Sequence, residues 1–258
     1  MNKLLGSIKK DFTTTTLVLI PVAIAINIVI GEIVVLLKLP VYLDSIGTVL
    51  VGAICGPWAG ALTGALSNTI WGLLIDPNAL PWWPVALVIG FVAGWAAYFG
   101  LFRTWWKVIV AGLCIAVGST LASTPISVWI YGGITASGSS FITAYLLQTG
   151  QGLWQAVIGT NLVTEPVDKT ATALLAFAII AGLSTRYLSR FPRAENVKPE
   201  PSSGSSVWAI VLTVVAIVLI IAAGVWVGNP VYYIIGIVVA AIVIGVTLFT
   251  SRRSAAAS

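Results

Sequence analysis

The stretch TTTLVLIPVAIAINIVIGEIVVLL, residues 14–37, decides the fold class of this chain. It is long enough to cross the hydrocarbon core of a bilayer, which takes about 20 apolar residues in a helix. The rest of the chain has the same character, with a mean hydropathy of +1.04. Only 8% of its residues are charged, against about 25% in soluble domains. Because lipid leaves no solvent partner for backbone polar groups, the sequence predicts an all-α integral membrane protein.

Eight apolar runs predict eight membrane spans. In chain order they cover residues 14–37, 43–56, 57–75, 84–102, 107–131, 167–185, 207–227 and 230–250. The second and third runs meet at Gly56 and Pro57, where proline cannot continue a helix, so we expect a tight helical hairpin. A polar linker rich in Pro and Ser, residues 191–206, resembles a flexible cytoplasmic hinge. It divides a six-span core, residues 1–190, from a two-span C-terminal hairpin and short basic tail, residues 207–258.

The basic residues indicate the orientation of these spans. With eight spans, only Lys38 and Lys169 fall on the side opposite the N-terminus. The eleven basic residues on the N-terminal side are Lys3, Lys9, Lys10, Arg103, Lys107, Arg186, Arg190, Arg193, Lys198, Arg252 and Arg253. Cytoplasmic loops carry the excess of Lys and Arg, so we expect a multi-pass protein with both termini in the cytoplasm.

The sequence contains little that indicates catalysis. It has no histidine, and its two cysteines lie far apart in apolar runs, so neither a metal site nor a disulfide framework is expected. No phosphate-binding loop, H-E-x-x-H or G-x-S-x-G motif occurs. The net charge of +5 is distributed between spans rather than on a soluble face, which argues against nucleic-acid binding. We expect a non-enzymatic protein without a cofactor.

Polar and aromatic residues near the expected outer face suggest a ligand site. Aromatic walls with a few polar groups are typical of a small-molecule pocket, although an interfacial aromatic belt explains the tryptophans equally well. Asn27 and Asn68 either bond across helices or contact a ligand. The candidate binding residues are Asn27, Tyr42, Asp44, Asn68, Trp71, Asp76, Trp82, Trp83, Trp129, Gln151, Trp154, Gln155, Asn161 and Glu165.

Two further expectations concern the region around these candidates. The connection 131–166 is too apolar for a simple linker, and its middle is expected to form a short helix that acts as a lid. Asp168 and Lys169 are expected to open the sixth span beside Glu165, either as a helix cap with a local ion pair or as ligand contacts. Glu32, in the outer half of the first span, is expected either to face protein or water or to reach the interface.

Small residues at intervals of four indicate close helix contacts. Gly56, Gly60 and Gly64 form one such row, and Ala86, Gly90 and Gly94 form another. The spacing fits internal packing, and it fits equally a flat surface for another membrane protein.

Three stretches carry a resemblance to a known family. They are LPVYLDSIGTVLVGAICGPWAGALTGALSNTIWGLL at 39–74, ITASGSSFITAYLLQTGQGLWQAVIGT at 134–160 and EPVDKTATALLAFAII at 165–180. These stretches resemble the substrate-binding S components of energy-coupling factor (ECF) transporters, prokaryotic membrane proteins that capture vitamins and related micronutrients. The resemblance covers residues 14–190.

The resemblance implies a six-helix core with its ligand site near the outer face. It also implies partners, namely a transmembrane coupling protein and two cytoplasmic ATPases that supply the phosphate-binding loop absent here. Family members often dock through Ala-x-x-x-Ala in the first span, where this chain has Ala23, Asn27 and Gly31. The added C-terminal hairpin is a second departure. The candidate docking residues are Ala23, Gly31, Gly56, Gly60 and Gly64.

The leading hypothesis is therefore a substrate-capture subunit of a vitamin-type importer in the prokaryotic cell membrane, in contact with membrane lipid. A ring-bearing solute suits the aromatic loops. Two alternatives remain, a sensory or signalling membrane module and a membrane enzyme. No output domain follows the last span, and carboxylates for acid–base or metal chemistry are scattered along the sequence.

Overall fold

A computed structural model describes residues 2–198, and all regular structure among them is helical. The expected spans 207–227 and 230–250, and the last part of the linker, lie outside the described residues. The elements in chain order are α1 (Asn2–Asp11), α2 (Thr14–Leu36), α3 (Ile46–Cys55), α4 (Pro57–Leu74), η1 (Pro77–Trp82), α5 (Trp83–Tyr98), α6 (Trp105–Tyr131), α7 (Ser140–Gln148), α8 (Leu153–Gly182), α9 (Thr185–Leu188) and η2 (Ala194–Asn196).

Three helical segments of the described chain are long and apolar enough to cross a membrane. They are Thr14–Leu36, Pro77–Tyr98 and Trp105–Tyr131. Each overlaps one of the expected spans, although Pro77–Tyr98 begins seven residues before the expected span 84–102 and ends four residues before the end of that span. The all-helical class is therefore confirmed for this part of the chain, and the three segments support the membrane class predicted from hydropathy.

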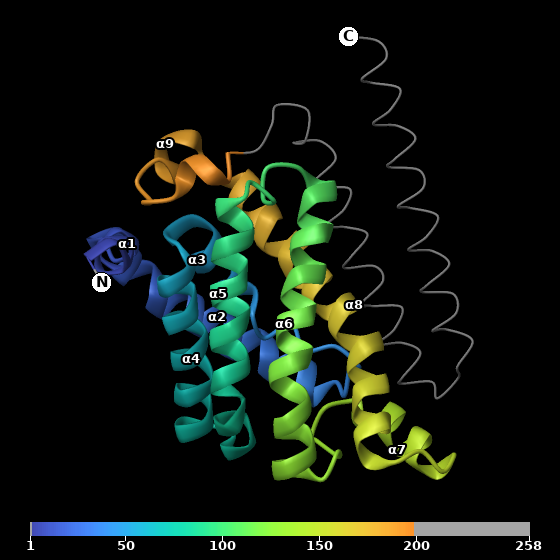
Figure 1. The fold of residues 1–258 in the computed structure, drawn as a ribbon. Coiled ribbons are helices and arrows are strands. Elements are labelled where there is room, and N and C mark those ends of the chain that lie inside the picture. Colours follow the sequence, from blue (N-terminus) through green and yellow to red (C-terminus); the bar gives the residue numbers. More distant parts are fainter. Residues whose placement is uncertain (1, 199–258) are drawn as a thin grey trace, which may run out of the picture. The chain divides into compact units, whose positions relative to one another are not determined.

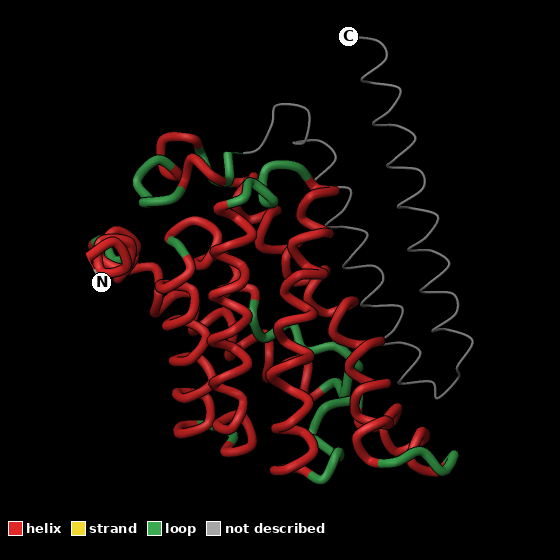
Figure 2. The backbone as a smooth tube through the Cα atoms, viewed as in Figure 1, coloured by secondary structure: helices red, strands yellow, loops and turns green. Residues whose placement is uncertain are grey.

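The hairpin at Gly56 and Pro57 is confirmed, but its first arm is not a span. Helix α3 has only 10 residues, or about 15 Å at 1.5 Å per residue, half of a hydrocarbon core. All of its residues are buried, and it packs against α2, α4, α5 and α8. The run 43–56 therefore forms a central helix, entered through a loop that passes between the other helices (Figure 2).

Helix α8 also differs from its expected boundaries. The expected span began at residue 167, whereas the helix begins at Leu153 and continues through Pro166. A proline removes one helix hydrogen bond but does not end a helix whose neighbours pack around it. Asp168 and Lys169 consequently lie buried in the middle of α8 and do not cap it. Lys169 is not an outer-face residue. The short helix expected in the preceding connection is present as α7.

The small residues hold the helices of the described unit together. A Cβ atom on Gly60 would lie 2.6 Å from the carbonyl oxygen of Gly90, and one on Gly64 would lie 2.1 Å from that of Ala86. Only glycine allows α4 to approach α5 this closely. Internal packing therefore accounts for these positions, and they offer no docking surface here. The five candidate docking residues, all buried, are Ala23, Gly31, Gly56, Gly60 and Gly64.

One end of the described unit, the α9 end, is closed by an ion pair. Figure 1 shows α9 and the α5–α6 connection at this end, with η1 and α7 at the other. Arg193 donates two hydrogen bonds to Oδ1 of Asp11, at 3.0 and 2.7 Å. Asp11 also accepts from the backbone N–H of Trp58 at the start of α4. Burial raises the pKa of the Asp11 carboxyl, and Arg193 opposes this shift.

Candidate ligand-binding site

A cavity lies toward the other end of the unit, near η1 and α7. The space between its walls, open mouth and adjoining solvent included, amounts to about 980 Å³. Its walls come from the α2–α3 connection, α4, η1, α5, α6, the α6–α7 connection, α7 and α8. Eight candidates from the sequence line it, and they are Tyr42, Asp44, Asn68, Trp71, Asp76, Trp82, Asn161 and Glu165.

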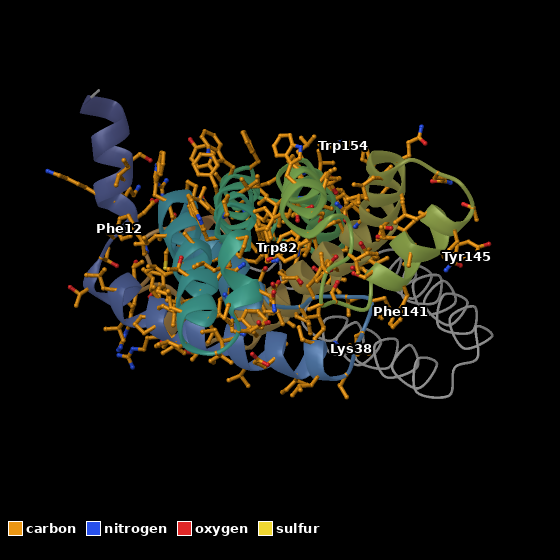
Figure 3. All side chains as sticks on the ribbon, turned by 90° about the horizontal axis from the view of Figure 1, so that it is seen from below. Phe12, Lys38, Trp82, Phe141, Tyr145 and Trp154 are labelled. Atoms are coloured by element: carbon orange, nitrogen blue, oxygen red, sulfur yellow. The ribbon has the colours of Figure 1, made fainter. Side chains whose placement is uncertain are left out.

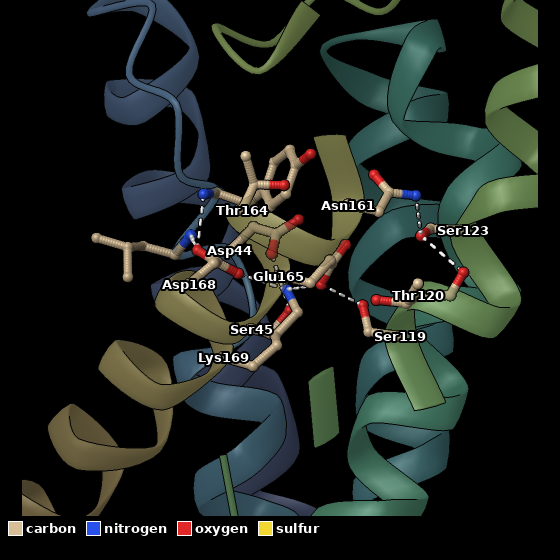
Figure 4. Close-up of polar contacts among 12 residues, drawn as sticks. Asp44, Ser45, Ser119, Thr120, Ser123, Asn161, Thr164, Glu165, Asp168 and Lys169 are labelled. Atoms are coloured by element: carbon tan, nitrogen blue, oxygen red, sulfur yellow. Dashed lines mark hydrogen bonds and ion pairs between the residues drawn. The ribbon is translucent and has the colours of Figure 1, made fainter. Parts of the chain in front are cut away.

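A buried ionic group forms one wall of the cavity (Figure 4). Nζ of Lys169 lies 2.5 Å from Oδ2 of Asp168 and 3.7 Å from Oε2 of Glu165. The hydroxyl of Ser119, on α6, donates to the same Glu165 oxygen at 2.6 Å. Asp44 accepts from its neighbour Ser45 and forms no ion pair among the described side chains. The group therefore contains more carboxylates than ammonium groups.

Asp168 also fixes the loop that enters the bundle. Its Oδ1 accepts hydrogen bonds from the backbone N–H groups of Tyr42 and Leu43, at 2.7 and 2.8 Å. Non-helical backbone at membrane depth must be satisfied in this way by protein groups. Leu43 has a φ of +51°, a left-handed conformation that is unfavourable for a leucine. The carboxylate of Asp168 holds this strained backbone in place.

Two loops meet over the cavity. The hydroxyl groups of Tyr42 and Ser139 lie 2.9 Å apart, and Lys38 donates to the carbonyl oxygen of Ala136 at 3.2 Å. A Cβ atom on Gly138 would lie 2.2 Å from the carbonyl oxygen of Lys38. The α6–α7 connection therefore packs directly against the α2–α3 connection.

Aromatic rings form another part of the lining. Trp82 of η1 stacks on Tyr131 of α6, with ring centroids 5.2 Å apart and an angle of 11° between the planes. Trp71 of α4 is only 5% exposed, and its Nε1 donates to Glu32 at 2.6 Å. Glu32 is thus paired with a tryptophan. Gly31 provides the room for the Trp71 ring, because a Cβ atom there would lie 2.5 Å from it.

Two buried asparagines face the cavity with free hydrogen-bonding capacity. Asn68 on α4 is 4% exposed and lines the cavity, yet its side chain has no hydrogen-bond partner among the described residues. Asn161 on α8 donates to Ser123 and Thr124 of α6, at 3.2 and 3.0 Å, and its amide oxygen has no protein partner within the described chain. Neither free amide group is among the fully enclosed atoms without a partner. Both open onto the cavity, so they are available for ligand contacts.

The other sequence candidates lie away from this cavity. Asn27 is satisfied within the protein by Thr48, Ser67 and the backbone of Gly47. The remaining five, Trp83, Trp129, Gln151, Trp154 and Gln155, are exposed.

Figure 3, which views the described unit along its helices, places Trp82 among the helices and Trp154 at their periphery. Trp154 packs edge-on against Trp129, which is 76% exposed. This pair has the position of an interfacial aromatic belt. Gln155 accepts a hydrogen bond from the backbone N–H of Gly152, the N-cap residue of α8, so its side chain caps that helix.

Sequence reasoning missed a row of serines and the central ammonium group. Ser119, Ser123 and Ser127 line the cavity at intervals of four along α6, so they share one helix face. This spacing in an otherwise apolar run was a usable signal. Lys169 was left out of the candidates because the predicted boundary placed it at the start of the sixth span, where a helix cap with a local ion pair was an equal alternative.

Comparisons with known proteins identify no relative. No family model matches the chain, and no curated protein or solved structure matches it either. The fold and the cavity therefore provide the structural evidence on function.

Proposed function

We propose that this chain is the substrate-binding S component of an ECF-type importer and captures a small, ring-bearing, vitamin-like solute. The observation that carries the proposal is the cavity between η1 and α7. Its lining combines the stacked rings of Trp82 and Tyr131 with polar groups. This combination is typical of sites that bind a small molecule by shape and orient it by a few hydrogen bonds.

The unpartnered amide of Asn68 gives the proposal its sharpest support. A polar group that opens onto the cavity and has no partner among the described residues is available to hydrogen-bond a ligand. Both Asn68 and the free amide oxygen of Asn161 line the same cavity. A ligand with donor and acceptor groups at its ring edge would satisfy both.

The proposed role is capture without chemistry, and the energy for uptake comes from partners. The chain has no phosphate-binding loop, so a transmembrane coupling protein and two cytoplasmic ATPases would drive release to the inside. In this arrangement the cavity faces the outside and the α9 end, rich in basic residues, faces the cytoplasm.

The test combines binding with uptake. The purified full-length chain in detergent is titrated with a panel of ring-bearing micronutrients, with tryptophan fluorescence and calorimetry as readouts. We expect one compound to bind below the micromolar range. Uptake of that compound into cells should require co-expression of the coupling protein and both ATPases.

A matched control separates capture from energy supply. ATPases whose phosphate-binding lysine is replaced should abolish uptake and leave binding by the purified chain unchanged. If no compound binds and no coupling protein co-purifies with the chain, the proposed function is wrong.

A further inference from the structure

The charges that line the cavity do not cancel. Three carboxylates, Asp44, Asp76 and Glu165, and one ammonium group, Lys169, contribute to its wall. Lys169 already pairs at 2.5 Å with a fourth carboxylate, Asp168, which lies behind the wall and is fully buried. The lining therefore carries a formal charge of −2, and its one ammonium group is shared between Asp168, outside the lining, and Glu165, 3.7 Å away within it.

The position of Asp44 makes it the least compensated of these groups. One oxygen accepts from Ser45 at 2.8 Å, and among residues 2–198 no side chain forms an ion pair with it. Asp44 lies in the α2–α3 connection and Glu165 on α8, and both point toward the same space (Figure 4). Asp76, by contrast, lies at the mouth and accepts two hydrogen bonds from Asn78.

Uncompensated carboxylates in the interior of a membrane protein are costly, because little water is present to solvate them. A positively charged ligand would lower this cost, and an anionic ligand would raise it. We infer that the cavity selects an organic cation, in which a ring packs near Trp82 and Tyr131 and a positive group lies beside Asp44. This inference rests on the proposed function and narrows its substrate class.

The geometry favours an organic cation over a metal ion. Within the described chain, no three His, Cys, Asp or Glu side chains converge closely enough to hold a metal. The lining also includes aromatic rings and apolar side chains such as Ile89 and Val157, which a bare ion would leave without a contact. The faces of Trp82 and Tyr131 add a surface of the kind that attracts organic ammonium groups.

The test sorts ligands by charge. A library of ring-bearing micronutrients and their analogues, grouped as cationic, neutral or anionic at pH 7, is added to the purified full-length chain, and thermal unfolding temperature is recorded. The tightest cation and its uncharged analogue are then compared by calorimetry. We expect the cation to bind at least about tenfold more tightly than the analogue.

Two variants test whether the carboxylate of Asp44 causes the preference for a cation. Asp44→Asn preserves the shape of the side chain and removes its charge, and it should weaken cation binding about tenfold or more while affecting the neutral analogue little. Glu195→Gln removes a carboxylate that is 88% exposed and should leave both affinities unchanged. The comparison of cation and analogue in the unmodified protein needs no variant, so it holds whether or not Asp44→Asn folds.

The outcomes separate this inference from the proposed function. Preferred binding of a neutral or anionic compound would overturn the inference and leave the capture function standing. Equal affinity for cation and analogue, unchanged in Asp44→Asn, would mean that a proton neutralises the carboxylates, and this also overturns the inference. Absence of binding by compounds of every charge would count against the proposed function itself.

Discussion

Asn27 on α2 and Asn68 on α4 lie on neighbouring helices and are buried to almost the same degree, at 1% and 4% exposed. Their surroundings are opposite. Asn27 makes three hydrogen bonds, to Thr48, Ser67 and the backbone of Gly47, whereas Asn68 makes none among the described residues and lines the cavity. The hydrogen bonds of Asn27 join α2, α3 and α4 in a closed network, whereas Asn68 is an open group that faces space a ligand can fill. Burial alone therefore does not reveal the role of a polar residue in an apolar helix. The role depends on whether protein partners use the hydrogen-bonding capacity of that residue.

Asp168 is a charged residue whose hydrogen-bonding capacity is used by protein partners, as that of Asn27 is. Its removal should have the largest effect on stability among the variants considered. Asp168→Ala would leave Lys169 without its closest counter-charge and two loop N–H groups without an acceptor. We expect a loss of about 3–5 kcal/mol in the free energy of unfolding. Thermal and denaturant unfolding in detergent would measure it, with Asp76→Ala, at the cavity mouth, as the control. Near-equal stability of the two variants would contradict the structural role of Asp168.

Asn27→Ala tests the closed network directly. It removes all three hydrogen bonds and leaves the N–H of Gly47 buried without its acceptor, so we expect a loss of about 1–3 kcal/mol. Ligand affinity, measured by calorimetry under conditions where the variant stays folded, should not change. A selective loss of affinity at full stability would show that Asn27 belongs to the site.

Asn68→Ala should give the reverse pattern. Since the amide has no protein partner among the described residues, its removal should change the free energy of unfolding by less than about 1 kcal/mol. Affinity for the captured solute should fall about tenfold, the effect of losing one or two hydrogen bonds to a ligand. The same calorimetric and unfolding measurements as for Asn27→Ala apply. If both asparagine variants show the same changes in stability and in ligand affinity, the distinction between the structural role of Asn27 and the ligand-binding role of Asn68 is wrong.

The smallest expected effect on ligand affinity is that of replacing Trp154, which is compared with Trp82. Trp154→Ala should leave affinity unchanged, because Trp154 is 43% exposed and packs on Trp129 away from the cavity. Trp82→Ala is the matched comparison and should weaken binding, since its ring lines the cavity and stacks on Tyr131. Fluorescence titration of each variant would separate them. Weaker binding in Trp154→Ala would place the site at the periphery instead.

The candidate site was predictable in part. Asn68, Trp71, Asp76 and Trp82 were found because polar and aromatic residues between apolar runs stand out by composition. The serines of α6 were not among the candidates, and Lys169 was expected at the start of a span, as a helix cap or a ligand contact. The predicted boundary at Pro166 was wrong, since proline ends most helices in water but is accommodated where neighbouring helices supply packing.

The sequence by itself determined that this is a helical membrane protein, because runs of about 20 apolar residues have few other ways to satisfy their backbone in lipid. It also determined the hairpin at Gly56 and Pro57, a local property of proline. Only the tertiary structure decided that α3 is a buried half-length helix and that Lys169 lies inside α8. Only it separated Asn68, which faces the cavity, from Asn27, which does not. These features depend on contacts between residues distant along the chain, and hydropathy and spacing carry no information about which hydrogen bonds such contacts complete.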